Sequence, residues 1–179
     1  ECEKLAQKGL AQTSPGEISI SRARILLSLG ATQAAKGNLK DAVKGMEEAA
    51  HIFGRLVRKE KNATVLCNLA ELQVWQGSWV KAQKNIQKSI TLSQNAMYRR
   101  GEAHALTTSA MILIALGMMD KAVLNLHEGL RMSKELSISD NLIVGRLLLA
   151  KIALSKGDAH IANSHLNYGL RHSQESDPE

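Results

Sequence analysis

The stretch GNLKDAVKGMEEAA at Gly37–Ala50 decides the fold, because its opening glycine and the alanine five residues later recur along the chain. Three later stretches carry the same pair of residues: GSWVKAQKNIQKSI, GMMDKAVLNLHEGL and GDAHIANSHLNYGL. The glycines are Gly37, Gly77, Gly117 and Gly157, and the alanines are Ala42, Ala82, Ala122 and Ala162. Both residues therefore repeat every 40 positions. A fixed period of this length is typical of proteins built from stacked repeats.

Apolar residues flank each glycine at helical spacing. Leu26 and Leu29 precede Gly37, whereas Met46 and Ala49 follow it on the far side of Ala42. Intervals of three and four residues place side chains on one face of an α-helix. A glycine between two such segments can adopt the positive φ that often ends a helix. Each unit is therefore predicted to be two antiparallel helices joined at the glycine.

Small and polar residues near the glycines refine this prediction. Four small residues stand opposite the recurring alanines, namely Gly30, Ala70, Ala110 and Ala150. Small residues on both helices predict a close approach, which a larger side chain would prevent at a cost of about 1–3 kcal/mol. Asn38, Ser78 and Asp158 directly follow three of the glycines and are predicted to cap the second helix. Met118 cannot cap, so its turn is predicted to be weaker.

The pattern predicts nine helices in one all-α array over 1–179, with no domain boundary. Cys2, Ala6 and Gly9 lie 40 positions before Ala42, Met46 and Ala49. Glu1–Gln12 therefore matches the second helix of a repeat whose first helix would lie upstream. The repeats are predicted at 18–58, 61–95, 99–136 and 140–174, followed by a frayed tail at 175–179. The remaining helices are predicted at 18–36, 39–58, 61–76, 79–95, 99–116, 120–136, 140–156 and 159–174.

Composition limits the possible functions. Apolar residues make up 44% of the chain and aromatic residues only 3%, which suits closely packed helices. The net charge of +6 could suggest nucleic acid, but Lys and Arg are scattered. The densest run is RLVRKEKN at Arg55–Asn62, interpreted as a solvated helix end that the helix dipole favours. Neither nucleic acid nor membrane insertion is expected, and the sequence predicts an intracellular, cytoplasmic protein.

No residue pattern indicates catalysis. The six histidines form no recognisable ligand set, and His160 and His165 lie five residues apart, on different faces of a helix. There is no Ser-His-Asp order at known spacings and no phosphate-binding loop. Cys2 and Cys67 fit no ligand spacing and are interpreted as small packing residues. The chain is therefore predicted to be no enzyme and to hold neither metal nor cofactor.

At the level of the whole pattern, the units resemble tetratricopeptide repeats (TPRs). Tyr98–Leu136 is similar to the long repeats of kinesin light chains, Pins-type scaffolds and MalT-type regulators. The resemblance implies a right-handed superhelical solenoid of about four and a half TPR-like repeats. Three features depart from the family pattern. The usual helix-ending proline is missing, and the period is 40 residues, whereas about 34 is common in the family. The usual aromatic positions hold Gln33, Gln73, Leu113 and Ala153.

The resemblance also implies where a ligand would bind. In this family the first helix of each repeat lines a concave face, and the ligands are usually peptides. Carried over position by position, the candidate peptide-binding residues are Arg24, Leu27, Ala31, Thr64, Cys67, Asn68, Glu71, Trp75, His104, Thr107, Thr108, Met111, Val144, Leu147 and Lys151. Asn68 occupies the central place of the family's carboxylate clamp. The neighbouring first helices lack the matching lysines and arginine, so this clamp is disfavoured.

These residues form a mixed apolar and polar groove, which suits an extended or helical peptide with apolar anchors and a few charges. Trp75 is either such an anchor or a packing residue against the neighbouring helix. The predicted function is a scaffold module that binds a peptide of another protein. The alternative is a regulatory or sensor segment of a larger signalling or transcription regulator. The chain is expected to be a monomer or to associate weakly through the ends of the array.

Overall fold

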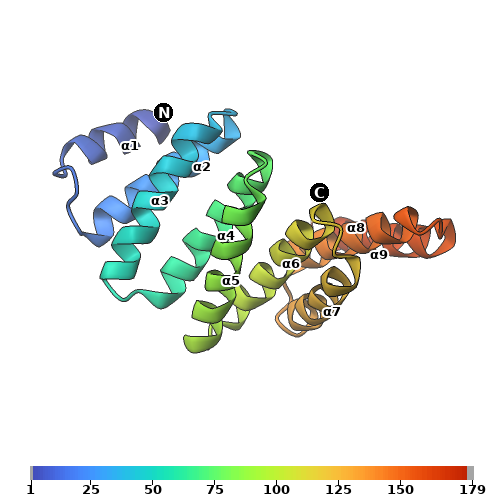
Figure 1. The fold of residues 1–179 in the computed structure, drawn as a ribbon. Helices are drawn as coiled ribbons and strands as arrows, with labels where there is room; N and C mark the ends of the chain where they lie inside the picture. Colours follow the sequence, from blue (N-terminus) through green and yellow to red (C-terminus); the bar gives the residue numbers. More distant parts are fainter. Residues whose placement is uncertain (1, 177–179) are drawn as a thin grey trace. The chain divides into compact units, whose positions relative to one another are not determined.

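The computed structural model describes the chain over residues 2–176 and the side chains of residues 3–171. This described part consists of α-helices and contains no strand (Figure 1). The helices are α1 (Cys2–Ala11), α2 (Ile20–Ala35), α3 (Leu39–Arg55), α4 (Lys59–Trp75), α5 (Trp79–Asn95), α6 (Arg99–Ala115), α7 (Met119–Glu135), α8 (Ser139–Ser155) and α9 (Ala159–Ser176). The all-α prediction of nine helices is thus confirmed over residues 2–176, and the expected tail at 177–179 lies outside the described residues.

The helices fall into two compact units, divided between Met97 and Tyr98. The first unit holds α1 to α5, in which α2 packs on α3 and α4 on α5. The second unit holds α6 to α9, in which α6 packs on α7 and α8 on α9. Within each unit the pairs are the predicted antiparallel hairpins. The expectation of one array without a boundary over 1–179 stays a prediction.

The recurring glycine joins the two helices of every pair, as predicted. Gly37, Gly77, Gly117 and Gly157 all have positive φ, between 71° and 82°. At Gly37 the turn is closed by two backbone bonds, from the Asn38 N–H to the Gln33 carbonyl and from the Gly37 N–H to the Ala34 carbonyl, both 2.9 Å. A Cβ at any of these four glycines would meet nothing within 4 Å. Backbone conformation, and not lack of space, therefore selects glycine.

The predicted caps are wrong at two of three positions. Asn38 and Ser78 make no side-chain hydrogen bond to the helix that follows them. Asn38 instead donates to the Gln33 side chain at 2.7 Å. Only Asp158 caps as predicted, because its Oδ1 accepts from the Ile161 N–H at 3.1 Å. Met118 has nearly the same backbone angles as Ser78, so the turn geometry does not depend on a capping side chain.

The turns between one pair and the next contain a second repeated positive-φ position, which the sequence pattern did not reveal. Val57, Met97 and Ser137 each have φ of 53°, again 40 residues apart. The turn at Val57 is closed by a bond from the Arg58 N–H to the Phe53 carbonyl at 2.9 Å. Residues other than glycine in this left-handed conformation cost about 1–2 kcal/mol, and most of all when they are β-branched, like Val57.

The close approach of paired helices is confirmed. A Cβ at Gly30 would lie 3.1 Å from Met46 Cγ and 3.2 Å from the Ala42 carbonyl oxygen. The small residues on both sides of each pair are buried, among them Ala42, Ala70, Ala82, Ala110, Ala122, Ala150 and Ala162. Larger apolar side chains, such as Phe53 in the first unit and Leu126 in the second, fill the remaining space.

Candidate functional site

A cavity of about 960 Å³ lies in the first unit, between α2 and α4. The turn after α3 and the C-terminal end of α5 complete its wall. The lining residues are Ile20, Arg24, Leu27, Ser28, Ala31, Phe53, Val57, Arg58, Lys59, Glu60, Lys61, Asn68 and Ala96. Its volume is at the upper end of the range for ligand pockets, so it is large enough to hold several side chains.

Four of the residues that the family resemblance implied meet in this cavity. Arg24, Leu27 and Ala31 come from one face of α2, and Asn68 comes from α4. Both are first helices of their pairs, because each glycine turn follows them. The cavity thus lies on the side of the first unit where the resemblance implies peptide binding.

The other candidates in the first unit lie outside the cavity lining. Cys67 is only 2% exposed, so it belongs to the interior. Thr64 is half-buried and donates from its hydroxyl to the Glu60 carbonyl at 3.0 Å. Glu71 is half-buried as well. Trp75 is 61% exposed and remains a candidate anchor at the end of α4.

The candidates in the second unit separate into exposed and buried side chains. His104, Val144, Leu147 and Lys151 are exposed, and Met111 is half-buried. Thr107 and Thr108 are buried, which removes them from any peptide-contacting surface. The Thr107 hydroxyl donates to the Ala103 carbonyl at 3.3 Å. It also lies against α7, where a Cβ at Gly129 would approach Thr107 Oγ1 to 3.0 Å.

Part of the basic run Arg55–Asn62 lines the cavity. Its cations are exposed, as predicted, but the helix-dipole argument holds only for Arg55, in the last turn of α3. The predicted helix end at Arg58 placed the run Arg55–Asn62 where a helix dipole favours cations. The structure ends α3 at Arg55 and begins α4 at Lys59, with Arg58 at its N-cap. Lys59 and Lys61 therefore stand in the first turn of α4, where the dipole disfavours positive charge. The sequence predicted the turn between α3 and α4 at 59–60, whereas it lies at 56–58, so Lys59 was not expected at the start of α4.

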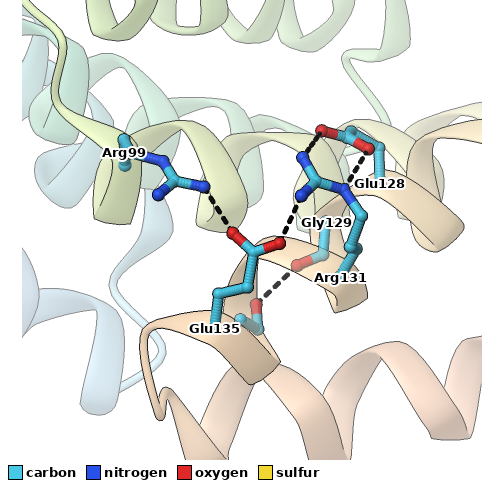
Figure 2. Close-up of polar contacts among 6 residues, drawn as sticks. Arg99, Glu128, Gly129, Arg131 and Glu135 are labelled. Carbon is cyan, nitrogen blue, oxygen red and sulfur yellow. Dashed lines mark hydrogen bonds and ion pairs between the residues drawn. The ribbon is translucent and has the colours of Figure 1, made fainter.

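A cluster of two arginines and two glutamates in the second unit neutralises itself (Figure 2). Arg131 donates to Glu128 at 2.6 Å and to Glu135, and Arg99 donates to Glu135 at 2.6 Å. The hydrogen bonds from these arginines lower the pKa of both glutamates. The Arg99–Glu135 ion pair joins α6 to α7. Two cations balance two carboxylates, so the cluster has no excess charge for a ligand.

A third polar group joins α8 to α9. The Arg146 guanidinium lies 4.1 Å from the centre of the Tyr168 ring and donates from Nη1 to His165 Nδ1 at 3.2 Å. Since arginine has no acceptor, Nδ1 must carry the lone pair, and the proton of neutral His165 is on Nε2. Burial lowers the pKa of His165, and the charge of Arg146 lowers it further, with a smaller effect from His127.

The second unit is therefore expected to lose stability as the pH falls. A lowered pKa means that folded His165 binds fewer protons than the unfolded chain near its ordinary pKa of about 6.5. The free energy of unfolding should decrease between about pH 7.5 and pH 5.5 and level off below the folded pKa. Urea unfolding of wild type and His165→Gln across this range measures the effect. A decrease of equal size in both proteins would contradict it.

Comparisons with known proteins support the repeat architecture. The model of a family described as MalT-like TPR region matches residues 1–177. A putative kinesin light chain from Podosopora anserina with nearly identical TPR-like repeats is 16% identical, with a TM-score of 0.72 over 98% of this chain and 84% of that one. BtubC from P. vanneervenii is 16% identical, with a TM-score of 0.76 over 99% and 75% of the two chains. MamA is 17% identical, with a TM-score of 0.64 over 97% and 88%.

At these identities the solved structures establish the fold alone. The search of curated proteins finds no match. None of the helices within residues 2–176 combines the length and the apolar character that crossing a bilayer requires.

Proposed function

Because the chain belongs to the MalT-like TPR region family, we propose that it is a protein-interaction module that binds a peptide segment of a partner protein in the cavity between α2 and α4. One observation carries the proposal. The cavity is lined by neighbouring first helices and gathers Arg24, Leu27, Ala31 and Asn68 on one surface. Repeat proteins of this kind reuse a rigid scaffold and place their specificity in such surface residues.

The lining suits a peptide better than a flat protein surface. Leu27 and Val57 contribute apolar wall, where a partner side chain can be buried. The Asn68 side-chain amide can both donate to and accept from the backbone of an extended peptide. Arg24 and the cations at the start of α4 surround this apolar wall with polar groups. An apolar centre within a polar rim is the usual anatomy of a specific interface.

Filling the cavity should abolish peptide binding without unfolding the protein. Ala31→Phe adds a ring at an exposed lining position, so we expect at least about a tenfold loss of affinity, which corresponds to about 1.4 kcal/mol. Peptides selected by phage display on the wild type, measured by fluorescence anisotropy, give the affinities. Ala35→Phe is the matched control, because Ala35 is exposed on the same helix and does not line the cavity. Equal binding by both variants would overturn the proposal.

The second candidate function is a regulatory or sensor segment of a larger protein. The family match favours this regulatory role, because the matching family is described as a MalT-like TPR region. In this role, ligand binding in the first unit would change the behaviour of the second. Hydrogen exchange with and without a selected peptide tests the idea. Altered protection in α6 to α9 supports a sensor, and a change confined to α2 to α5 supports a simple binding module.

A further inference from the structure

We propose that the cavity of the first unit selects acidic segments, in which two or more carboxylate side chains flank an apolar residue. The inference rests on the proposed function for its site and adds the chemistry of the ligand. Four cations line the cavity, Arg24, Arg58, Lys59 and Lys61, against the single carboxylate of Glu60. The lining therefore carries an excess of three positive charges, which favours an anionic partner over a neutral or basic one.

These four cations make no ion pair within the described part of the chain, and all are exposed. Cations elsewhere in the molecule do find carboxylates. Arg22 pairs with Glu48, Lys36 with Glu3, and Arg99 and Arg131 with the glutamates of Figure 2. These paired cations are neutralised within the protein, whereas the set around the cavity is available to a ligand.

The position of the cluster also works against the stability of the fold. Lys59 and Lys61 meet the positive end of the α4 dipole, which costs a few tenths of a kcal/mol for each charge. Charges placed against the stability of a helix at one surface are typical of functional sites. A carboxylate bound in the cavity would relieve the charge conflict at α4.

The apolar part of the lining distinguishes a peptide from a nucleic acid. Ile20, Leu27 and Val57 offer aliphatic contacts, whereas the only aromatic lining residue, Phe53, is 1% exposed. Single-stranded nucleic acids bind through bases that stack on accessible aromatic rings, and this cavity provides none. An aliphatic wall next to cations matches an apolar side chain between carboxylates.

Three peptide pools test the inference. Each contains fluorescein-labelled 12-residue peptides with an acetylated N-terminus and an amidated C-terminus, so that only side chains differ in charge. Four positions hold Asp or Glu in the first pool, Asn or Gln in the second and Lys in the third, and the others are randomised among apolar residues. At low salt we expect the acidic pool to bind at least about tenfold more tightly than the amide pool. Its affinity should fall with added salt.

Two charge-reversal variants show whether the cavity is responsible. Arg58→Glu/Lys59→Glu/Lys61→Glu reverses the cluster, and we expect it to weaken binding of the acidic pool at least about tenfold. Lys81→Glu/Lys84→Glu/Lys88→Glu makes the same change in net charge at exposed positions of α5 that do not line the cavity. This control should keep its affinity within about threefold of the wild type. Thermal melts followed by circular dichroism verify that both variants are folded.

The outcomes separate this inference from the proposed function. If the amide pool binds as tightly as the acidic pool and Ala31→Phe abolishes both, the cavity binds peptides but the inferred preference for acid is wrong. Equal weakening by both charge reversals would show attraction to net charge alone and would also overturn the inference. Tighter binding of a 12-nucleotide RNA than of the acidic pool would overturn it as well. If none of the three pools binds the wild type, the inference and the proposed function fail together.

Discussion

Glu48→Ala is expected to lower the free energy of unfolding of the first unit by about 2–3 kcal/mol. The cause is Arg22, whose side chain on α2 is only 8% exposed. Its Nε donates to Glu48 Oε1 on α3 at 2.8 Å, and Nη1 donates to the Thr13 hydroxyl at 2.7 Å. Removing the carboxylate leaves a buried guanidinium without its ion-pair partner. Because Glu48 is itself one-third exposed, water can compensate in part, and the effect stays below that of a fully buried pair.

Urea unfolding of the wild type and of the variants measures this change in the free energy of unfolding. Glu47→Ala is the matched control, because Glu47 is exposed on the same helix and makes no ion pair with the described residues. It should change the free energy of unfolding by less than about 0.5 kcal/mol. The double variant Arg22→Met/Glu48→Ala should recover much of the loss, since the uncompensated charge is then gone. Equal destabilisation by Glu47→Ala and Glu48→Ala would show that Arg22 does not depend on its partner.

The repeat period could be predicted because glycine at positive φ is a local requirement of the backbone. The second helix of the second pair begins at Trp79 and ends at Asn95, as the pattern predicted. The boundary between α3 and α4 could not be predicted in the same way. There Val57 adopts the left-handed conformation without a glycine and against its intrinsic preference. The predicted helix end at Arg58 was therefore three residues too late.

This small error had a large consequence for the candidate site. Leu27 and Asn68 were found by carrying over family positions on first helices, and both line the cavity. Lys59 and Lys61 were not predicted as site residues, because the basic run was interpreted as a helix C-terminal end, where the dipole favours cations. The structure places both lysines at a helix N-terminal end, where the dipole disfavours cations. Phe53 and Ala96 come from second helices, to which the resemblance assigned no role. The sequence pattern predicts which residues share a face of each helix, but it does not predict which turns complete the wall of a cavity.

Gly145→Ala is expected to destabilise the second unit by about 1–2 kcal/mol, although alanine is the better helix former. Gly145 lies within α8, where Leu130 of α7 packs against its backbone. A Cβ at this position would stand 2.7 Å from Leu130 Cδ2 and 3.0 Å from Leu130 Cγ. Leu130 is 7% exposed, so it must leave a packed position to make room. The cost of that displacement should exceed the gain in helix propensity.

Gly169→Ala, in the same unit, is expected to raise the free energy of unfolding. A Cβ at Gly169 in α9 would lie 3.9 Å from Arg146 Cβ, an ordinary contact. The alanine should then show its usual advantage over glycine inside a helix, about 0.5–1 kcal/mol of added stability. Urea unfolding of the two variants should therefore separate them by about 1.5–3 kcal/mol, with the wild type between them.

The comparison tests which constraint sets the spacing of α7 and α8. The positions equivalent to Gly145 in the two preceding pairs are Ala105 and Val65, both fully buried. The repeat therefore does not require glycine at this position. In α8 the glycine is explained by the size of the Leu130 side chain on the facing helix α7. The added variant Leu130→Ala should make Gly145→Ala nearly neutral, because the clash has been removed. If Gly145→Ala is as destabilising in the Leu130→Ala background as in the wild type, its cost comes from another contact and the proposed fit between the two helices is wrong.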